Sequence, residues 1–187
     1  MITIVSGLPR SGTSLMMQML QAGGLPLLCD ENRPADEHNP RGYLELQKVR
    51  SLEKDNSWVP DAEGKVVKVV SLLLYYLPAG FEYRVIFMRR DLDEVLRSQE
   101  RMLEDLNQPG GPMRETMKRH FTKHLDSLAE WVPRQPHVRM IDCSYAELVT
   151  SPAATAQTVI DFLGVDLNLE QMIEAVDPAL YRQRNER

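Results

Sequence analysis

The feature that most constrains the fold is the segment GLPRSGTS at residues 7–14. An apolar run at 2–6 (ITIVS) precedes it, and a helical pattern at 13–22 (TSLMMQMLQA) follows it. A strand, a glycine turn and a helix in this order let successive backbone N–H groups point inward, beside the positive end of the helix dipole. The segment therefore predicts a loop that binds the phosphates of a nucleotide.

The rest of the chain alternates short β-rich runs with longer helical patterns, which is typical of a parallel sheet covered on both faces. Further strands are expected at 65–70, 83–88 and 137–142, and further helices at 43–54, 91–106, 113–131 and 152–164. The length of 187 residues suits one domain. We expect residues 1–187 to form a single P-loop-type α/β domain with three layers, α/β/α, around a central parallel sheet of four to five strands.

Charge and cysteine content exclude several classes of partner. The net charge of −5 argues against a general nucleic-acid or anionic-membrane surface, which needs clustered Lys and Arg. The apolar run at 69–81 is too short to span a bilayer, and residues 2–8 lack the basic region of a signal peptide. Cys29 and Cys143 match no disulfide or metal pattern. We therefore expect a cytoplasmic protein.

The loop differs from that of a kinase or NTPase at one position, because Thr13 stands where a Walker-type loop has its lysine. Those enzymes use the lysine on the transferred phosphates. A kinase is therefore the less favoured alternative. Arg10 is the cation within the loop, and its forked guanidinium suits the oxygens of a phosphate or sulfuryl group.

Three segments resemble the sulfotransferase superfamily in the order that the superfamily has them. GLPRSGTSLM at 7–16 is similar to the 5'-phosphosulfate loop, especially to the PRSGT form of tyrosylprotein and bacterial members. VIFMRRDLDEVLRSQ at 85–99 resembles the 3'-phosphate element, in which an Arg ends a strand and a Ser follows eight residues later. CSYAELVTSPAATAQTVIDFLGV at 143–165 is similar to the YEDL and FLG region near the carboxyl end.

The resemblance implies 3'-phosphoadenylyl sulfate (PAPS) as co-substrate and 3',5'-adenosine bisphosphate (PAP) as product, with no metal. It implies that Arg90 and Ser98 bind the 3'-phosphate. Tyr145 is a further nucleotide-site candidate, with a packing role at a helix start as the alternative. It also implies that the 5'-phosphosulfate is bound by Arg10, Ser11, Gly12, Thr13 and Ser14.

Sulfuryl transfer needs donors on the bridging oxygen and a base on the acceptor hydroxyl. Arg10 is the first candidate donor. Lys68 is the second, because KVVKVVS at 65–71 resembles members that carry a lysine on the strand after a mobile loop, which we expect here near 25–42. The alternative for Lys68 is a strand-edge residue that faces solvent.

Glu45 is the preferred base, because NPRGYLE at 39–45 resembles the NPxGYxE stretch of bacterial members. His38 is the second candidate, since other branches use a histidine. Alternatively, this loop is only a hydrophilic lid. His120 and His124 have the i, i+4 spacing of a metal pair, but no third ligand is evident.

One family element, the RKGxxG segment of cytosolic members, has no counterpart here. Arg182 and Arg184 either supply late positive charge or belong to a solvated tail. The function expected is transfer of a sulfuryl group from PAPS to a hydroxyl or amine of a small-molecule acceptor. The alternatives are a non-catalytic module that holds PAP and, less favoured, a P-loop small-molecule kinase.

Overall fold

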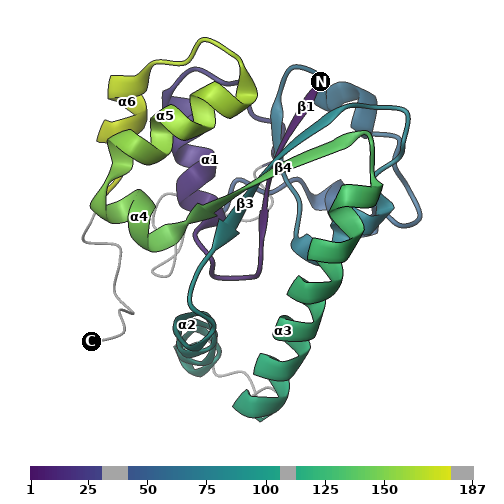
Figure 1. The fold of residues 1–187 in the computed structure, drawn as a ribbon, viewed down its shortest axis with the longest axis vertical. Helices are drawn as coiled ribbons and strands as arrows, with labels where there is room; N and C mark the ends of the chain where they lie inside the picture. Colours follow the sequence, from purple (N-terminus) through teal and green to yellow (C-terminus); the bar gives the residue numbers. More distant parts are fainter. Residues whose placement is uncertain (31–41, 106–112, 178–187) are drawn as a thin grey trace.

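The computed structural model describes residues 1–30, 42–105 and 113–177 (Figure 1). Within these ranges four parallel strands form one sheet in the order β2-β1-β3-β4. The strands are β1 (Ile2–Gly7), β2 (Val66–Lys68), β3 (Tyr83–Arg89) and β4 (Val138–Ser144). The predicted α/β class with a central parallel sheet is confirmed, with the lower of the two expected strand numbers.

Helices cover both faces of this sheet (Figure 1). One face carries α1 (Thr13–Ala22), α4 (Tyr145–Thr150), α5 (Pro152–Leu163) and α6 (Leu169–Glu174). The other carries α3 (Arg114–Trp131) and the 3-10 helices η1 (Gln47–Ser51), η2 (Val59–Ala62), η3 (Ser71–Tyr76) and η4 (Val132–Arg134). Helix α2 (Leu92–Asp105) follows β3 and lies beyond the end of that strand.

Alternation along the strands divides the apolar side chains between two cores. In β3, Ile86 and Met88 belong to the core under α1, whereas Val85 and Phe87 belong to the core on the α3 side. This period of two follows from the pleat of a strand. Because both faces are covered, β1 and β3 are mostly buried apolar runs, whereas the edge strand β4 also carries the exposed Arg139 and Asp142.

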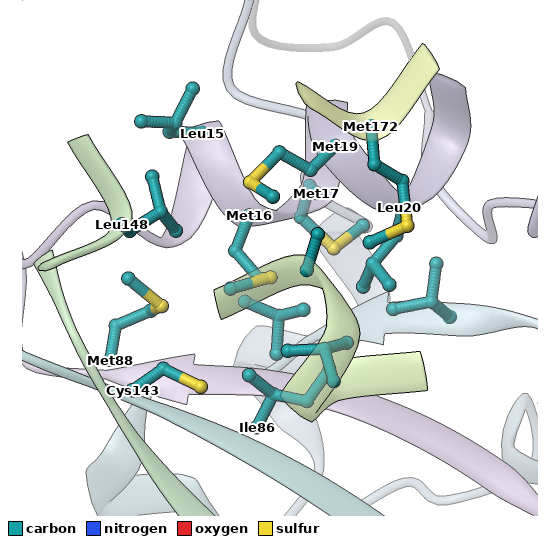
Figure 2. Packing of buried hydrophobic residues seen from close by; sticks show 14 of the residues in the cluster. Leu15, Met16, Met17, Met19, Leu20, Ile86, Met88, Cys143, Leu148 and Met172 are labelled. Atoms are coloured by element: carbon teal, nitrogen blue, oxygen red, sulfur yellow. The ribbon is translucent and has the colours of Figure 1, made fainter. Parts of the chain in front are cut away.

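Methionines fill the core between α1 and the sheet. Met16, Met17 and Met19 of α1 and Met172 of α6 are fully buried, and Figure 2 shows them together with residues of the sheet. The unbranched methionine side chain fits irregular gaps of this kind. Gly23 ends α1 against Met172, where an added Cβ would lie 2.7 Å from Met172 Cγ. This packing holds the N-terminus of α1 at the carboxyl end of β1.

The helix predicted over 43–54 is wrong. Residues 42–46 have no regular secondary structure, and only the short η1 follows them. Asp30 holds the segment in place, because its N–H donates to Glu45 O at 2.9 Å and its carboxylate accepts from Gln47 N at 2.6 Å. Leu44 has a φ of 52°, which an α-helix does not allow.

The expected mobile loop near 25–42 is described only up to residue 30. Leu28 N donates to Val66 O at 2.8 Å, so the start of the loop runs along the edge of β2. Residues 31–41 lie outside the described residues, so the expected mobility stays a prediction. Helix α6 was not predicted, although Asn168 caps it by accepting from Gln171 N at 3.0 Å. Among the described helices, none has the length and apolar character needed to cross a membrane.

Candidate functional site

The loop between β1 and α1 has a backbone that only glycine allows at two positions. At Gly7, with a φ of 151°, an added Cβ would clash with Ser11 Oγ and lie 2.9 Å from Met88 O. At Gly12, with a φ of 99°, an added Cβ would clash with the ring of Tyr145. Both glycines therefore let the loop lie close to neighbouring elements. Arg10 also has a left-handed φ, at 68°.

Two hydroxyl groups of the loop region differ in their surroundings. Ser11 is 1% exposed, and its Oγ has no hydrogen-bond partner among the described residues. Buried hydroxyls normally have a partner, so the oxygen of a bound phosphate or sulfuryl group fits this position. Ser14, next to Thr13 at the start of α1, accepts a hydrogen bond from Lys68 Nζ at 2.9 Å.

Arg90 and Ser98 lie beside the loop, as their spacing predicts. Arg10 Nε donates to Ser98 Oγ at 3.1 Å, and Arg90 Nη1 donates to Arg10 O at 3.1 Å. Ser98 is buried in the second turn of α2. Residues from two distant parts of the sequence, 10 and 90–98, therefore meet at the carboxyl ends of β1 and β3.

Arg89 points elsewhere. Its Nε pairs with Asp142 of β4 at 3.0 Å, and its guanidinium lies over the ring of Phe87. Adjacent residues at the end of a strand face opposite sides. Arg90 is thus the arginine that contacts the loop.

The side chains of Glu94 and Tyr145 contact the Arg90 side chain. Its Nε pairs with Glu94 Oε2 at 3.0 Å, and both side chains are buried, at 9% and 5% exposure. The ring of Tyr145 lies 4.6 Å from the guanidinium and also contacts Gly12. Tyr145 is itself buried, which favours the packing alternative over direct contact with a ligand. The sequence analysis gave Glu94 no role in the site, although its i, i+4 spacing from Arg90 was a signal.

Lys68 joins the loop to the segment that precedes η1. Besides Ser14, its Nζ donates to Tyr43 O at 2.7 Å and lies 3.6 Å from Glu45 Oε1. The Lys68 side chain is 9% exposed, so the solvent-facing alternative is wrong. The other oxygen of Glu45 lies 3.6 Å from Arg50, which the sequence analysis did not identify. The structure thus brings the candidate base and the candidate cation together.

The remaining candidates are less informative. His38, Arg182 and Arg184 lie outside the described residues. His124 Nε2 lies 2.9 Å from Ser71 Oγ, and burial lowers the pKa of this imidazole. Within the described ranges, no three His, Cys, Asp or Glu side chains gather as metal ligands would.

The sequence matches the model of one known protein family. A family model described as the sulfotransferase family matches residues 68–169, which is more than half of the chain. The chain belongs to the sulfotransferase family. The predicted membership is thereby confirmed, and the match includes Lys68, Arg90 and Ser98 but not the loop at 7–14. A search of curated proteins found no match.

Solved structures of sulfotransferases have the same fold. The sulfotransferase domain of the Synechococcus PCC 7002 olefin synthase is 20% identical, with 99% of this chain and 88% of that chain covered and a TM-score of 0.60. The sulfotransferase domain from the curacin biosynthetic pathway is 16% identical over 94% and 77%, with a TM-score of 0.54. Mouse sulfotransferase SULT7A1 complexed with PAP is 16% identical over 93% and 62%, with a TM-score of 0.54. At these identities the likeness establishes the fold alone.

Proposed function

We propose that this chain transfers a sulfuryl group from PAPS to a hydroxyl or amine of a small acceptor. The observation that carries the proposal is the convergence of Arg10, Arg90 and Ser98 on the loop that joins β1 to α1. Membership of the sulfotransferase family supports it. The complex of the mouse relative with PAP supports the choice of nucleotide.

In this proposal the nucleotide is held at both of its charged ends. The loop N–H groups, the positive end of α1 and the Arg10 guanidinium bind the 5'-phosphosulfate. The hydroxyls of Ser11, Thr13 and Ser14 add hydrogen bonds. Arg90 and Ser98 bind the 3'-phosphate, which a user of ATP or GTP does not need to recognise.

The transfer step breaks the bond between sulfur and the bridging oxygen of PAPS and forms a bond between sulfur and the acceptor oxygen or nitrogen. Arg10 and Lys68 stabilise the negative charge that develops on the bridging oxygen. Glu45 takes the proton of the acceptor. Lys68 lies close to both Ser14 and Glu45, so one residue joins the donor side to the acceptor side. The products are PAP, the sulfated acceptor and the proton.

A thermal-shift comparison of nucleotides tests the proposal. We expect PAP, without magnesium, to stabilise the protein by roughly 2.7 kcal/mol at a concentration one hundred times its dissociation constant. ADP, AMP and ATP should stabilise it much less, because they lack the 3'-phosphate that Arg90 and Ser98 bind. Equal or greater stabilisation by magnesium-ATP would favour the kinase alternative instead.

A further inference from the structure

A buried ion pair lies at the proposed 3'-phosphate site. Glu94 belongs to the first turn of α2, and Arg90 lies just before that helix. The Asp91 carboxylate fixes this turn by accepting from the N–H groups of Asp93 and Glu94 at 2.9 and 3.1 Å. Because the backbone of Glu94 is held, its carboxylate reaches Arg90 Nε from one defined direction.

Among the described residues, three different groups hold the Arg90 guanidinium. Glu94 binds the Nε edge, the carbonyl of Arg10 accepts from Nη1, and the ring of Tyr145 lies against the planar group. Two of these contacts lead directly to the loop, since Arg10 is part of it and Tyr145 packs against Gly12. Glu94 is the member that comes from α2, the helix that also carries Ser98.

We propose that Glu94 is a positioning residue for recognition of the 3'-phosphate. It holds the guanidinium of Arg90 in the orientation in which Arg90 and Ser98 can bind the same phosphate beside the loop. The inference rests on the proposed function. Arginine binds phosphate through a planar fork, so the direction of the fork decides the strength of the bond. A long side chain that is already ordered also loses less conformational freedom when the ligand binds. A buried guanidinium without a partner would be unfavourable, which is a further reason for the pair.

The charge of Glu94 acts in the opposite direction to its positioning effect. A carboxylate next to the site repels a phosphate, so its removal by itself would tighten the binding of PAP. Loss of positioning would weaken the binding of PAP. The two effects have opposite signs, and the sign of the measured change therefore decides between them.

The experiment compares two ligands on the full chain by calorimetry: PAP and adenosine 5'-phosphosulfate, which lacks the 3'-phosphate. We expect Glu94→Ala to weaken PAP by about 10-fold, as for the loss of one charge-assisted hydrogen bond, and to leave adenosine 5'-phosphosulfate within about 2-fold. Glu94→Gln should weaken PAP less, because its amide oxygen still accepts from Arg90 Nε. This graded loss, confined to the 3'-phosphorylated ligand, is not expected from general damage to the fold.

Glu100→Gln is the matched control. It removes a carboxylate from the same helix, but Glu100 is 46% exposed and pairs with Arg114 of α3. We expect it to change neither affinity. Melting of the free protein checks that each variant is folded, and Glu94→Gln alone decides the result if Glu94→Ala does not fold.

Unchanged or tighter binding of PAP in the folded Glu94 variants would overturn the inference, as would equal weakening of both ligands. Those results would leave the proposed function intact, provided that the wild-type protein prefers PAP. A wild-type protein that binds PAP no better than AMP, which differs from PAP only by the 3'-phosphate, would overturn the proposed function, and the inference with it.

Discussion

We expect Glu45→Gln to lower turnover by about 100-fold or more while leaving the affinity for PAP nearly unchanged. The substitution keeps the shape of the side chain but removes the carboxylate that we propose as the base for the acceptor proton. Glu45 lies beside Lys68 and outside the loop proposed to bind the donor, so the affinity for the nucleotide should not change. The measurement is release of PAP from PAPS in the presence of an acceptor identified by screening.

Glu53→Gln is the matched control, because Glu53 is an exposed carboxylate in the same region of the chain. The contact between Glu45 and Lys68 allows a second explanation for lost turnover, namely a displaced Lys68. The pH dependence separates the two, since loss of a base removes the acidic limb of the rate profile and a displaced cation does not. Unchanged turnover in Glu45→Gln would remove Glu45 from the mechanism and favour His38.

Arg90→Ala is expected to weaken PAP by about 10- to 100-fold, the effect of losing a charge-assisted hydrogen bond to phosphate. Binding of adenosine 5'-phosphosulfate should hardly be affected, because it lacks the 3'-phosphate that Arg90 is proposed to bind. Arg89→Ala is the control, since Arg89 points to Asp142 on β4. Calorimetry with both ligands on both variants measures the difference.

Arg90→Ala also removes the ion-pair partner of Glu94, so this variant can lose stability as well as affinity. Breaking a buried pair by removing one partner costs about 3–5 kcal/mol, because the other charge stays buried. Arg90→Lys is therefore a useful second variant, which keeps the cation near Glu94 but loses the planar fork. If Arg90→Ala weakens both ligands equally, or if Arg89→Ala carries the effect, the placement of the 3'-phosphate site is wrong.

The placement of Arg90 and Ser98 beside the loop at 7–14 could be predicted because its signals are local. A buried apolar run, two glycines and a helical pattern define the loop at 7–14, and each depends only on neighbouring residues. The position of Ser98 relative to Arg90 follows from a strand end and two turns of helix. Parallel strands end at the same edge of the sheet. The position of Arg90 at the end of a predicted strand was therefore enough to place it near the loop that follows β1.

The conformation of residues 43–54 could not be predicted in the same way, because tertiary contacts decide it. YLELQKVRSLEK has helical periodicity, yet the ammonium of Lys68 binds the carbonyl of Tyr43 and Asp30 binds the backbone of Gln47. These contacts join residues 17 to 25 positions apart, which no local pattern encodes. The pairing of Glu94 had a local signal in its i, i+4 spacing from Arg90, but the sequence did not show in which direction Arg90 points.

The strand order has a consequence for how members of this family can diversify. The loop follows β1, and the strands on either side of β1 deliver different groups to it: β2 brings Lys68 and β3 brings Arg90. If the donor binds as proposed, the residues that act on the acceptor lie on the β2 side of β1, and the residues that bind the 3'-phosphate lie on the β3 side. A chimera that takes residues 25–68 from a relative would acquire the acceptor preference of that relative and keep its own nucleotide affinity.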